Sequence, residues 1–231
     1  MSRTTALACA IALVAAAEAP AFADDAVNAN SPAPPANVVI QVSRGDVWTY
    51  DVRDDIVDEA KGTIAFEVTK VTDGAIETRT VQHKQATNAE TTNADIFDSR
   101  WRLKDNSKVV YQPHSDDTGV PEDLQVGKSW SFKFDSVRKG AAQTREFAGV
   151  GKVEAWEHVT LPNGSAYDAF KLDVRFATST ANDRKRETHT VMWFAPVVNR
   201  LVKRIDEIRV NGKLEDSTEQ TLREYKPAPK T

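Results

Sequence analysis

The stretch Phe170-Lys-Leu-Asp-Val-Arg-Phe176 decides the fold class of this 231-residue chain. Large apolar side chains occupy its even positions, and charged side chains occupy its odd positions. Successive side chains of a β-strand point to opposite faces of the sheet, so this period of two predicts a strand with one buried face and one solvated face. Sheets built from such strands are usually antiparallel, since parallel sheets bury both faces.

The same period of two recurs in other segments, and turn residues separate them. Asn-Gly and Asp-Gly pairs favour the tight turns of β-hairpins because both residues of each pair tolerate positive φ. Helical periodicity is scarce, and no segment sustains it for more than a turn or two. The alternating segments are Trp48–Val52, Ile64–Val68 and Trp130–Phe134, and the turn pairs are Asp73-Gly74, Asn163-Gly164 and Asn211-Gly212.

Without helices, the apolar faces of the sheet must cover one another. We therefore predict an all-β fold made of an antiparallel curled sheet or open barrel, with a two-sheet β-sandwich as the alternative. The charged strand that ends at Tyr225 is predicted to be an edge of the sheet, because charged side chains protect edges from pairing. Apolar positions change parity within Leu201–Val210, which predicts a β-bulge near Asp206-Glu207.

A short pattern occurs twice, 82 positions apart. Gly45-Asp-Val-Trp-Thr-Tyr50 and Gly127-Lys-Ser-Trp-Ser-Phe132 both place Trp three residues after Gly and another aromatic residue two positions later. The pattern is consistent with two similar halves. It is equally consistent with a convenient way to start a strand of large residues after a turn, and the sequence leaves both interpretations open.

The two ends of the chain differ in composition from the middle. Residues 1–23 combine a positive start, an apolar run over Ala6–Ala17 and a small-x-small ending, which predicts a secretory signal peptide cleaved after Ala23. A bilayer-spanning helix needs about 20 apolar residues, and no segment of the mature chain reaches that length. The predicted parts after the signal are a Pro/Ala-rich spacer over residues 24–37, a single β domain over 38–226 and a disordered tail over 227–231.

Composition argues against several classes of protein. Removing residues 1–23 removes one base and one acid, so the formal charge stays at −4, and the electrostatic basis for nucleic-acid binding is absent. The one cysteine, Cys9, lies in the predicted signal, so the mature chain has no thiol for disulfides, metal sites or nucleophilic catalysis. Cys9 is a poor lipid-anchor site because the longer part of the apolar run follows it.

The sequence contains no catalytic or metal-binding motif that we can identify. None of the four histidines has a partner at metal-ligand spacing. The loop His114-Ser-Asp-Asp117 gathers polar groups, but it lacks the alternating oxygens and the glycine of a calcium loop. Gly-x-Ser-x-Gly and phosphate-binding glycine loops are also absent. We therefore predict no catalytic residue, no metal and no cofactor, while enzyme activity is not excluded because triads assemble from distant segments.

One segment carries a resemblance to known proteins. Trp193-Phe-Ala-Pro196, followed by Val198-x-x-Leu-Val-Lys203, resembles the closing hairpin of bacterial exported β-proteins of unassigned function. The usual loop glycine is absent, and Val198, Asn199 and Arg200 stand in its place. These proteins are similar to the open, curled sheets of lipoprotein carriers in the bacterial envelope. The resemblance implies an exported β-protein with a concave apolar face that takes a lipid or lipoprotein.

The candidate ligand-binding residues are Trp101, Trp156 and Trp193, because their strands have the less regular parity; the alternative is that all three fill the core. We expect a periplasmic or secreted, non-catalytic envelope protein that binds an apolar ligand or a lipoprotein acyl chain on the concave face. Two alternatives stay open. One is a structural or interaction module whose edge strand pairs with an envelope protein. The other is a hydrolase acting on envelope material.

Overall fold

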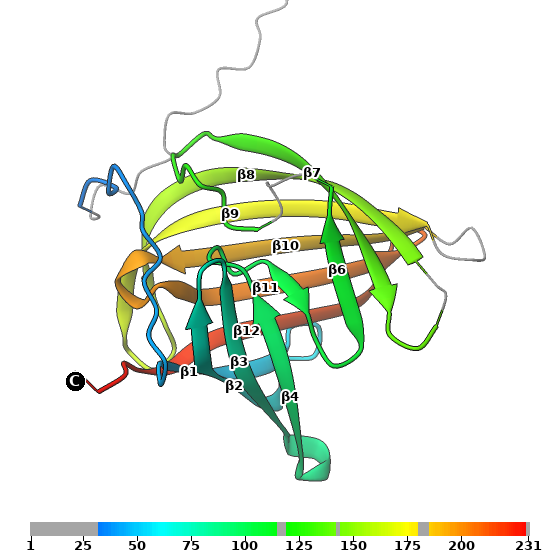
Figure 1. Ribbon diagram of the computed structural model, residues 1–231, viewed down its shortest axis with the longest axis horizontal. Helices are drawn as coiled ribbons and strands as arrows, with labels where there is room; N and C mark the ends of the chain where they lie inside the picture. The colour runs from blue at the N-terminus through cyan, green and yellow to red at the C-terminus, as the bar shows by residue number, and fades with distance from the viewer. Residues whose placement is uncertain (1–31, 115–118, 142–143, 180–184, 230–231) are drawn as a thin grey trace, which may run out of the picture.

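Twelve antiparallel strands make up this all-β molecule, as the computed structural model shows (Figure 1). The structure describes residues 32–114, 119–141, 144–179 and 185–229. The first six strands are β1 (Val47–Asp54), β2 (Glu59–Thr72), β3 (Ala75–Lys84), β4 (Ala89–Phe97), β5 (Leu103–Asp105) and β6 (Val109–Pro113). The last six are β7 (Ser129–Arg138), β8 (Thr144–Thr160), β9 (Ala166–Ser179), β10 (Lys185–Ala195), β11 (Arg200–Val210) and β12 (Lys213–Lys226).

The sheet closes into a barrel. Each strand pairs with its neighbours in sequence, and β1 pairs with β12 from Val47↔Lys226 to Asp54↔Thr218. The all-β antiparallel prediction is confirmed, whereas the prediction that the strand ending at Tyr225 is an edge is wrong. Closure supplies hydrogen-bond partners for the backbone groups that β1 and β12 would each otherwise leave unpaired. Of the charged residues that suggested an edge, Arg223 and Glu224 are exposed, and Glu219 forms an ion pair with Lys203 of β11.

Two short 3₁₀ helices interrupt the strands, η1 (Gln85–Thr87) and η2 (Pro196–Val198). Each is followed by an asparagine with positive φ, 51° at Asn88 and 55° at Asn199. Asparagine tolerates this left-handed conformation better than other non-glycine residues. Asn199 thus takes the conformation that the missing loop glycine would have supplied between β10 and β11. Within the described residues, no helix has the length and apolar character needed to span a membrane.

The repeated Gly-x-x-Trp pattern occupies equivalent places at the start of β1 and of β7. Gly45 and Gly127 have φ of 98° and 88°. The amide of Gly45 donates to the carbonyl of Val68 at 2.8 Å, and the amide of Gly127 donates to the carbonyl of Val153 at 2.8 Å. A register shift follows each of these buried valines. The two copies therefore begin two six-strand halves with the same local geometry.

The predicted bulge lies in β11, but several residues earlier than expected. The pairing of β10 with β11 passes from Trp193↔Lys203 to Phe194↔Leu201, which leaves Val202 as the extra residue. Leu201 and Arg204 consequently both line the interior of the barrel, although they differ in parity. The prediction placed the bulge near Asp206-Glu207 because it assigned Ile205 to the inner face, whereas Ile205 pairs with Val191 on the outer face.

Two glycines of β8 make room for aromatic side chains of β7. A Cβ atom at Gly151 would lie 2.2 Å from Cζ2 of Trp130, and one at Gly149 would lie 2.6 Å from Cζ of Phe132. Real carbon atoms do not approach so closely, so only glycine fits at either position while these rings stay in place. The residues before β1 also pack on the barrel, since Val38 and Ile40 contact the core cluster around Phe170 (Figure 1, blue).

Candidate ligand-binding cavity

A cavity of about 880 Å³ lies inside the barrel. This volume falls within the range of about 300–1,000 Å³ that is typical of small-molecule sites. Side chains from both halves of the chain line it. The aromatic part of the lining includes Phe66, Phe97, Trp101, Phe132, Phe134 and Phe176, and the polar part includes Gln82, Asn93, Asp95, Arg200, Arg204 and Gln220.

The cavity reaches the surface beside β5 and β6. Lys104, Ser107 and Pro113 belong to its lining and are themselves exposed. The wall is thin at this point, because β5 has only three residues and a single registered pair, Asp105↔Val110, joins it to β6. A ligand therefore has a route into the interior beside β5 and β6, within the first half of the barrel.

Phenylalanine rings from β7 and β9 form one apolar wall of the cavity. Phe132 and Phe134 stack with ring centroids 6.2 Å apart, and Phe176 lies 6.3 Å from Phe132 and 6.2 Å from Phe134. Alternation along both strands directs these rings inward, as the period of two predicted. Such a wall presents apolar surface from which water is readily displaced by a hydrocarbon chain.

Arg200 is a buried cationic residue of the cavity lining. Its side chain is 8% exposed, although it carries a guanidinium group. The central carbon of that group lies 3.9 Å from the ring centroid of Trp101 and 4.2 Å from that of Phe66. These distances are those of cation–π contacts, in which the negative face of a ring stabilises a cation. Burial lowers the pKa of Arg200, and the neighbouring Tyr50 opposes that shift.

Tyr50 lies beside Arg200 and stays neutral. Burial raises the pKa of its phenol to about 12, even though Arg200 acts to lower it. The Tyr50 hydroxyl donates to the carbonyl of Leu201 at 2.7 Å. Since a phenol with this pKa is protonated at neutral pH, Tyr50 does not neutralise the charge of Arg200.

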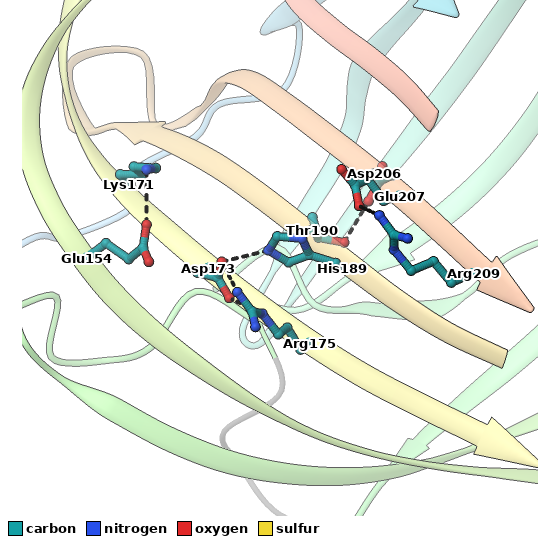
Figure 2. Close-up of polar contacts among 9 residues, drawn as sticks. All are labelled: Glu154, Lys171, Asp173, Arg175, His189, Thr190, Asp206, Glu207 and Arg209. Atoms are coloured by element: carbon teal, nitrogen blue, oxygen red, sulfur yellow. Dashed lines mark hydrogen bonds and ion pairs between the residues drawn. The ribbon is translucent and has the colours of Figure 1, made fainter. Parts of the chain in front are cut away.

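Two buried donors in the lining lack hydrogen-bond partners among the described residues, Nη1 of Arg200 and Nε1 of Trp130. Other polar groups of the interior have partners, among them Arg204 and Thr190. Arg204 donates two hydrogen bonds to Asp206, at 2.7 and 2.8 Å. The Thr190 hydroxyl donates to the same carboxylate at 2.7 Å (Figure 2). Buried donors without acceptors are rare and require an explanation.

Of the three predicted tryptophans, Trp101 lines the cavity. Its indole Nε1 donates to the carbonyl of Asn199 at 2.7 Å, and its ring stands nearly perpendicular to that of Trp48, with centroids 5.4 Å apart. Trp101 has a φ of 60°, which is uncommon for a bulky residue. This backbone conformation belongs to the link between β4 and β5, at the side where the cavity opens.

The other two predicted tryptophans lie away from the cavity lining. Trp156 is buried, with its ring 4.6 Å from that of Phe170, and its Nε1 donates to the carbonyl of Pro32 at 2.6 Å. Trp193 has the opposite parity to the inward-facing Phe194, and its Nε1 donates to Glu157 at 2.5 Å. Irregular parity reflects bulges and end-of-strand packing at these positions, so it did not single out the residues that face the interior.

The sequence pattern does not indicate Arg200 as a site residue. Arg200 stands where a loop glycine is usual, but nothing local distinguishes it from the other arginines. The aromatic rings around it come from β1, β2, β4 and the link after β4, as the contacts of Trp48, Phe66, Phe97 and Trp101 show. Only the closed barrel brings these segments together.

Charged pairs cover the outer face of β8 to β11. Lys171 contacts Glu154 at 3.0 Å, and Asp173 contacts His189 at 2.6 Å and Arg175 at 3.0 Å (Figure 2). Burial raises the pKa of Asp173, but hydrogen bonds from His189 and Arg175 outweigh it and place that pKa below its usual value. These are ordinary ion pairs of a solvated sheet face.

The described residues contain no group of three or more histidine, cysteine or acidic side chains that could hold a metal ion. His114 is exposed, and its Nε2 lies 2.9 Å from a carboxylate oxygen of Asp135 on the paired strand β7. Ser115, Asp116 and Asp117 of the same loop lie outside the described residues. The described part of the loop therefore offers one histidine–carboxylate pair.

Solved structures of other proteins resemble this chain in fold. No family model and no curated protein matches the chain. The structure of a candidate lipoprotein from Parabacteroides distasonis ATCC 8503 matches with a TM-score of 0.53 and 15% identity, over 84% of this chain and all of that one. A candidate exported protein with a YmcC-like fold from Bacteroides fragilis NCTC 9343 matches with a TM-score of 0.52 and 14% identity, over 82% of this chain and 99% of that one. The chain shares the fold of these proteins.

Proposed function

We propose that this protein is a non-catalytic, exported protein of the cell envelope that binds the apolar chain of a lipid or lipoprotein inside its barrel. One observation carries the proposal: a cavity of about 880 Å³ with phenylalanine walls inside the barrel. The signal-like residues 1–23 and the lipoprotein and exported structural neighbours support a periplasmic or secreted location.

The lining of the cavity suits a hydrocarbon chain better than a compact polar substrate. The free energy gained by burying apolar surface is roughly proportional to the area removed from water. A hydrocarbon chain that lies against Phe132, Phe134 and Phe176 therefore gains affinity along its whole length. The polar side chains on the remaining lining suit a ligand with one polar end.

The alternative of an interaction module loses its support. That alternative depended on a free edge at the strand ending with Tyr225, and β12 is paired on both sides, with β11 and with β1. The hydrolase alternative depended on the His114 loop, whose described part is a single exposed histidine paired with Asp135.

Binding can be tested with an environment-sensitive fluorescent fatty acid added to the purified mature protein. We expect saturable binding with a blue shift, because the probe enters an apolar interior. Val174→Trp, which places a large ring at a lining position, is expected to weaken binding at least tenfold. Gln82→Trp provides a second filling variant at a half-buried lining position, in case the first does not fold.

Val150→Trp is the matched control, because it adds the same ring to the outer face of β8, where Val150 is 57% exposed. It is expected to leave binding unchanged. Native mass spectrometry of protein purified from its source gives an independent readout of bound lipid. The proposal fails if no lipid copurifies and the unmodified protein does not bind the probe.

A further inference from the structure

The lining of the cavity holds more hydrogen-bond donors than its own acceptors satisfy. Nη1 of Arg200 and Nε1 of Trp130 are both buried, both belong to the lining, and both lack partners among the described residues. Each is a donor and neither is an acceptor. A ligand that completes these interactions must therefore supply acceptor atoms.

Arg200 also carries a buried positive charge without an ion-pair partner among the described residues. Its neighbour Arg204 donates two hydrogen bonds to Asp206, so Arg204 and Arg200 differ in what they can offer a ligand. The nearby phenol of Tyr50 is neutral because burial raises its pKa to about 12. Asp95 raises the pKa of Arg200 only weakly, and its carboxylate accepts a hydrogen bond from Thr80.

The aromatic rings hold the guanidinium in place for a ligand. Trp101 and Phe66 lie 3.9 and 4.2 Å from its central carbon, so these rings stabilise the cation, while Nη1 is a donor without an acceptor among the described residues. A guanidinium edge matches the geometry of carboxylate and phosphate oxygens. Its low-dielectric surroundings strengthen such a contact.

We propose that the ligand of this cavity is an anionic amphiphile, whose carboxylate or phosphate oxygens bind Arg200 and whose apolar chain lies on the phenylalanine wall. This inference rests on the proposed function and narrows it to a ligand class. The shared chemistry is an oxyanion at the end of a hydrocarbon chain. Nε1 of Trp130 is the second unpartnered donor among the residues that line the cavity.

The test compares three ligands of equal chain length with the mature, full-length protein. Dodecanoate, dodecyl phosphate and dodecanol are titrated against bound N-phenyl-1-naphthylamine, a neutral fluorescent probe. We expect at least one of the two anions to displace the probe at a concentration at least tenfold lower than dodecanol. Which anion is the better competitor distinguishes a carboxylate ligand from a phosphate ligand.

Arg200→Met is expected to abolish the preference for the anion and to leave dodecanol within about twofold of its original potency, because a loss of one charge-assisted contact affects only the charged ligand. Arg175→Met is the matched control: it makes the same substitution and the same change of charge on the outer face, where Arg175 pairs with Asp173. It is expected to leave all three ligands unchanged.

Three outcomes overturn the inference. Equal displacement by dodecanol and both anions from the unmodified protein overturns it and leaves the proposed function standing, and this comparison needs no variant to fold. Equal weakening of all three ligands by Arg200→Met shows that Arg200 only supports the packing of its rings. Failure of the neutral probe and of all three ligands to bind the unmodified protein overturns the proposed function itself.

Discussion

Gly151 shows how one residue without a side chain shapes the interior. Trp130 packs across β8 where Gly151 lies, and that contact orients a large ring toward the cavity. The Gly149-Val-Gly151 segment offers no catalytic serine, and its role is to admit the rings of Trp130 and Phe132. Spacing alone could not reveal this, because the ring that needs the space is on a different strand.

Gly151→Ala is expected to destabilise the protein by about 1–3 kcal/mol, the usual effect of overpacking, because its new Cβ would lie 2.2 Å from Trp130. Urea denaturation monitored by tryptophan fluorescence measures the change. Val150→Thr, one position away on the exposed face, is expected to change stability by less than about 0.5 kcal/mol. A Gly151→Ala protein as stable as the unmodified one would mean that Trp130 does not occupy this position.

At the scale of the element, the two Gly-x-x-Trp strand starts are the clearest likeness between the halves of the barrel. Gly45 and Gly127 share positive φ, the same hydrogen bond to a buried valine and the same register shift after it. Neither glycine is short of space, since the nearest atom to an added Cβ is 3.6 Å away at Gly45 and beyond 4 Å at Gly127. What requires glycine at both positions is therefore the backbone conformation.

Gly45→Ala and Gly127→Ala are accordingly expected to destabilise the protein by similar amounts, about 1–2 kcal/mol each, which is the usual penalty for positive φ at a residue with a Cβ. Thermal or urea unfolding of both variants checks the prediction. Ser131→Ala, at an exposed position of β7, is the control and should stay within about 0.5 kcal/mol. Markedly unequal effects would argue against equivalent roles for the two strand starts.

At the scale of the whole molecule, closure creates the interior in which a ligand can bind. The pairing of β1 with β12 joins residues that are far apart along the sequence, such as Val52 and Gln220. It converts a curled sheet with two open edges into a barrel whose apolar face encloses a cavity. The weakest part of the wall lies elsewhere, at the short strand β5, where the cavity reaches the surface.

Hydrogen exchange followed by NMR tests this closure. Successive amides of a strand point alternately to its two neighbours, so in the closed barrel all amides of Thr218–Thr221 are expected to be protected. The amides of β9, which is paired on both sides, provide the reference. Fast exchange at every second amide of Thr218–Thr221 would show that β12 is an edge after all.

The all-β antiparallel class and the hairpin turns follow from the sequence alone. They depend on local rules: the alternation in Phe170–Phe176 specifies a half-buried strand, and Asn211-Gly212 forms a turn in which both residues have positive φ, 51° and 81°. The loop between β10 and β11 forms without its usual glycine because Asn199 adopts the left-handed conformation. Such features can be predicted because they involve residues that are neighbours along the chain.

Tertiary structure decided the closure of the sheet, the choice of Trp101 over Trp156 and Trp193 for the cavity lining, and the burial of Arg200. Parity assigns a side chain to one face of a strand, but curvature and bulges decide what that face encloses. The environment of Arg200 depends on rings contributed by strands far away in sequence. Electrostatic and packing interactions between distant segments exist only once the barrel has closed, so the sequence pattern carries no local signal for them.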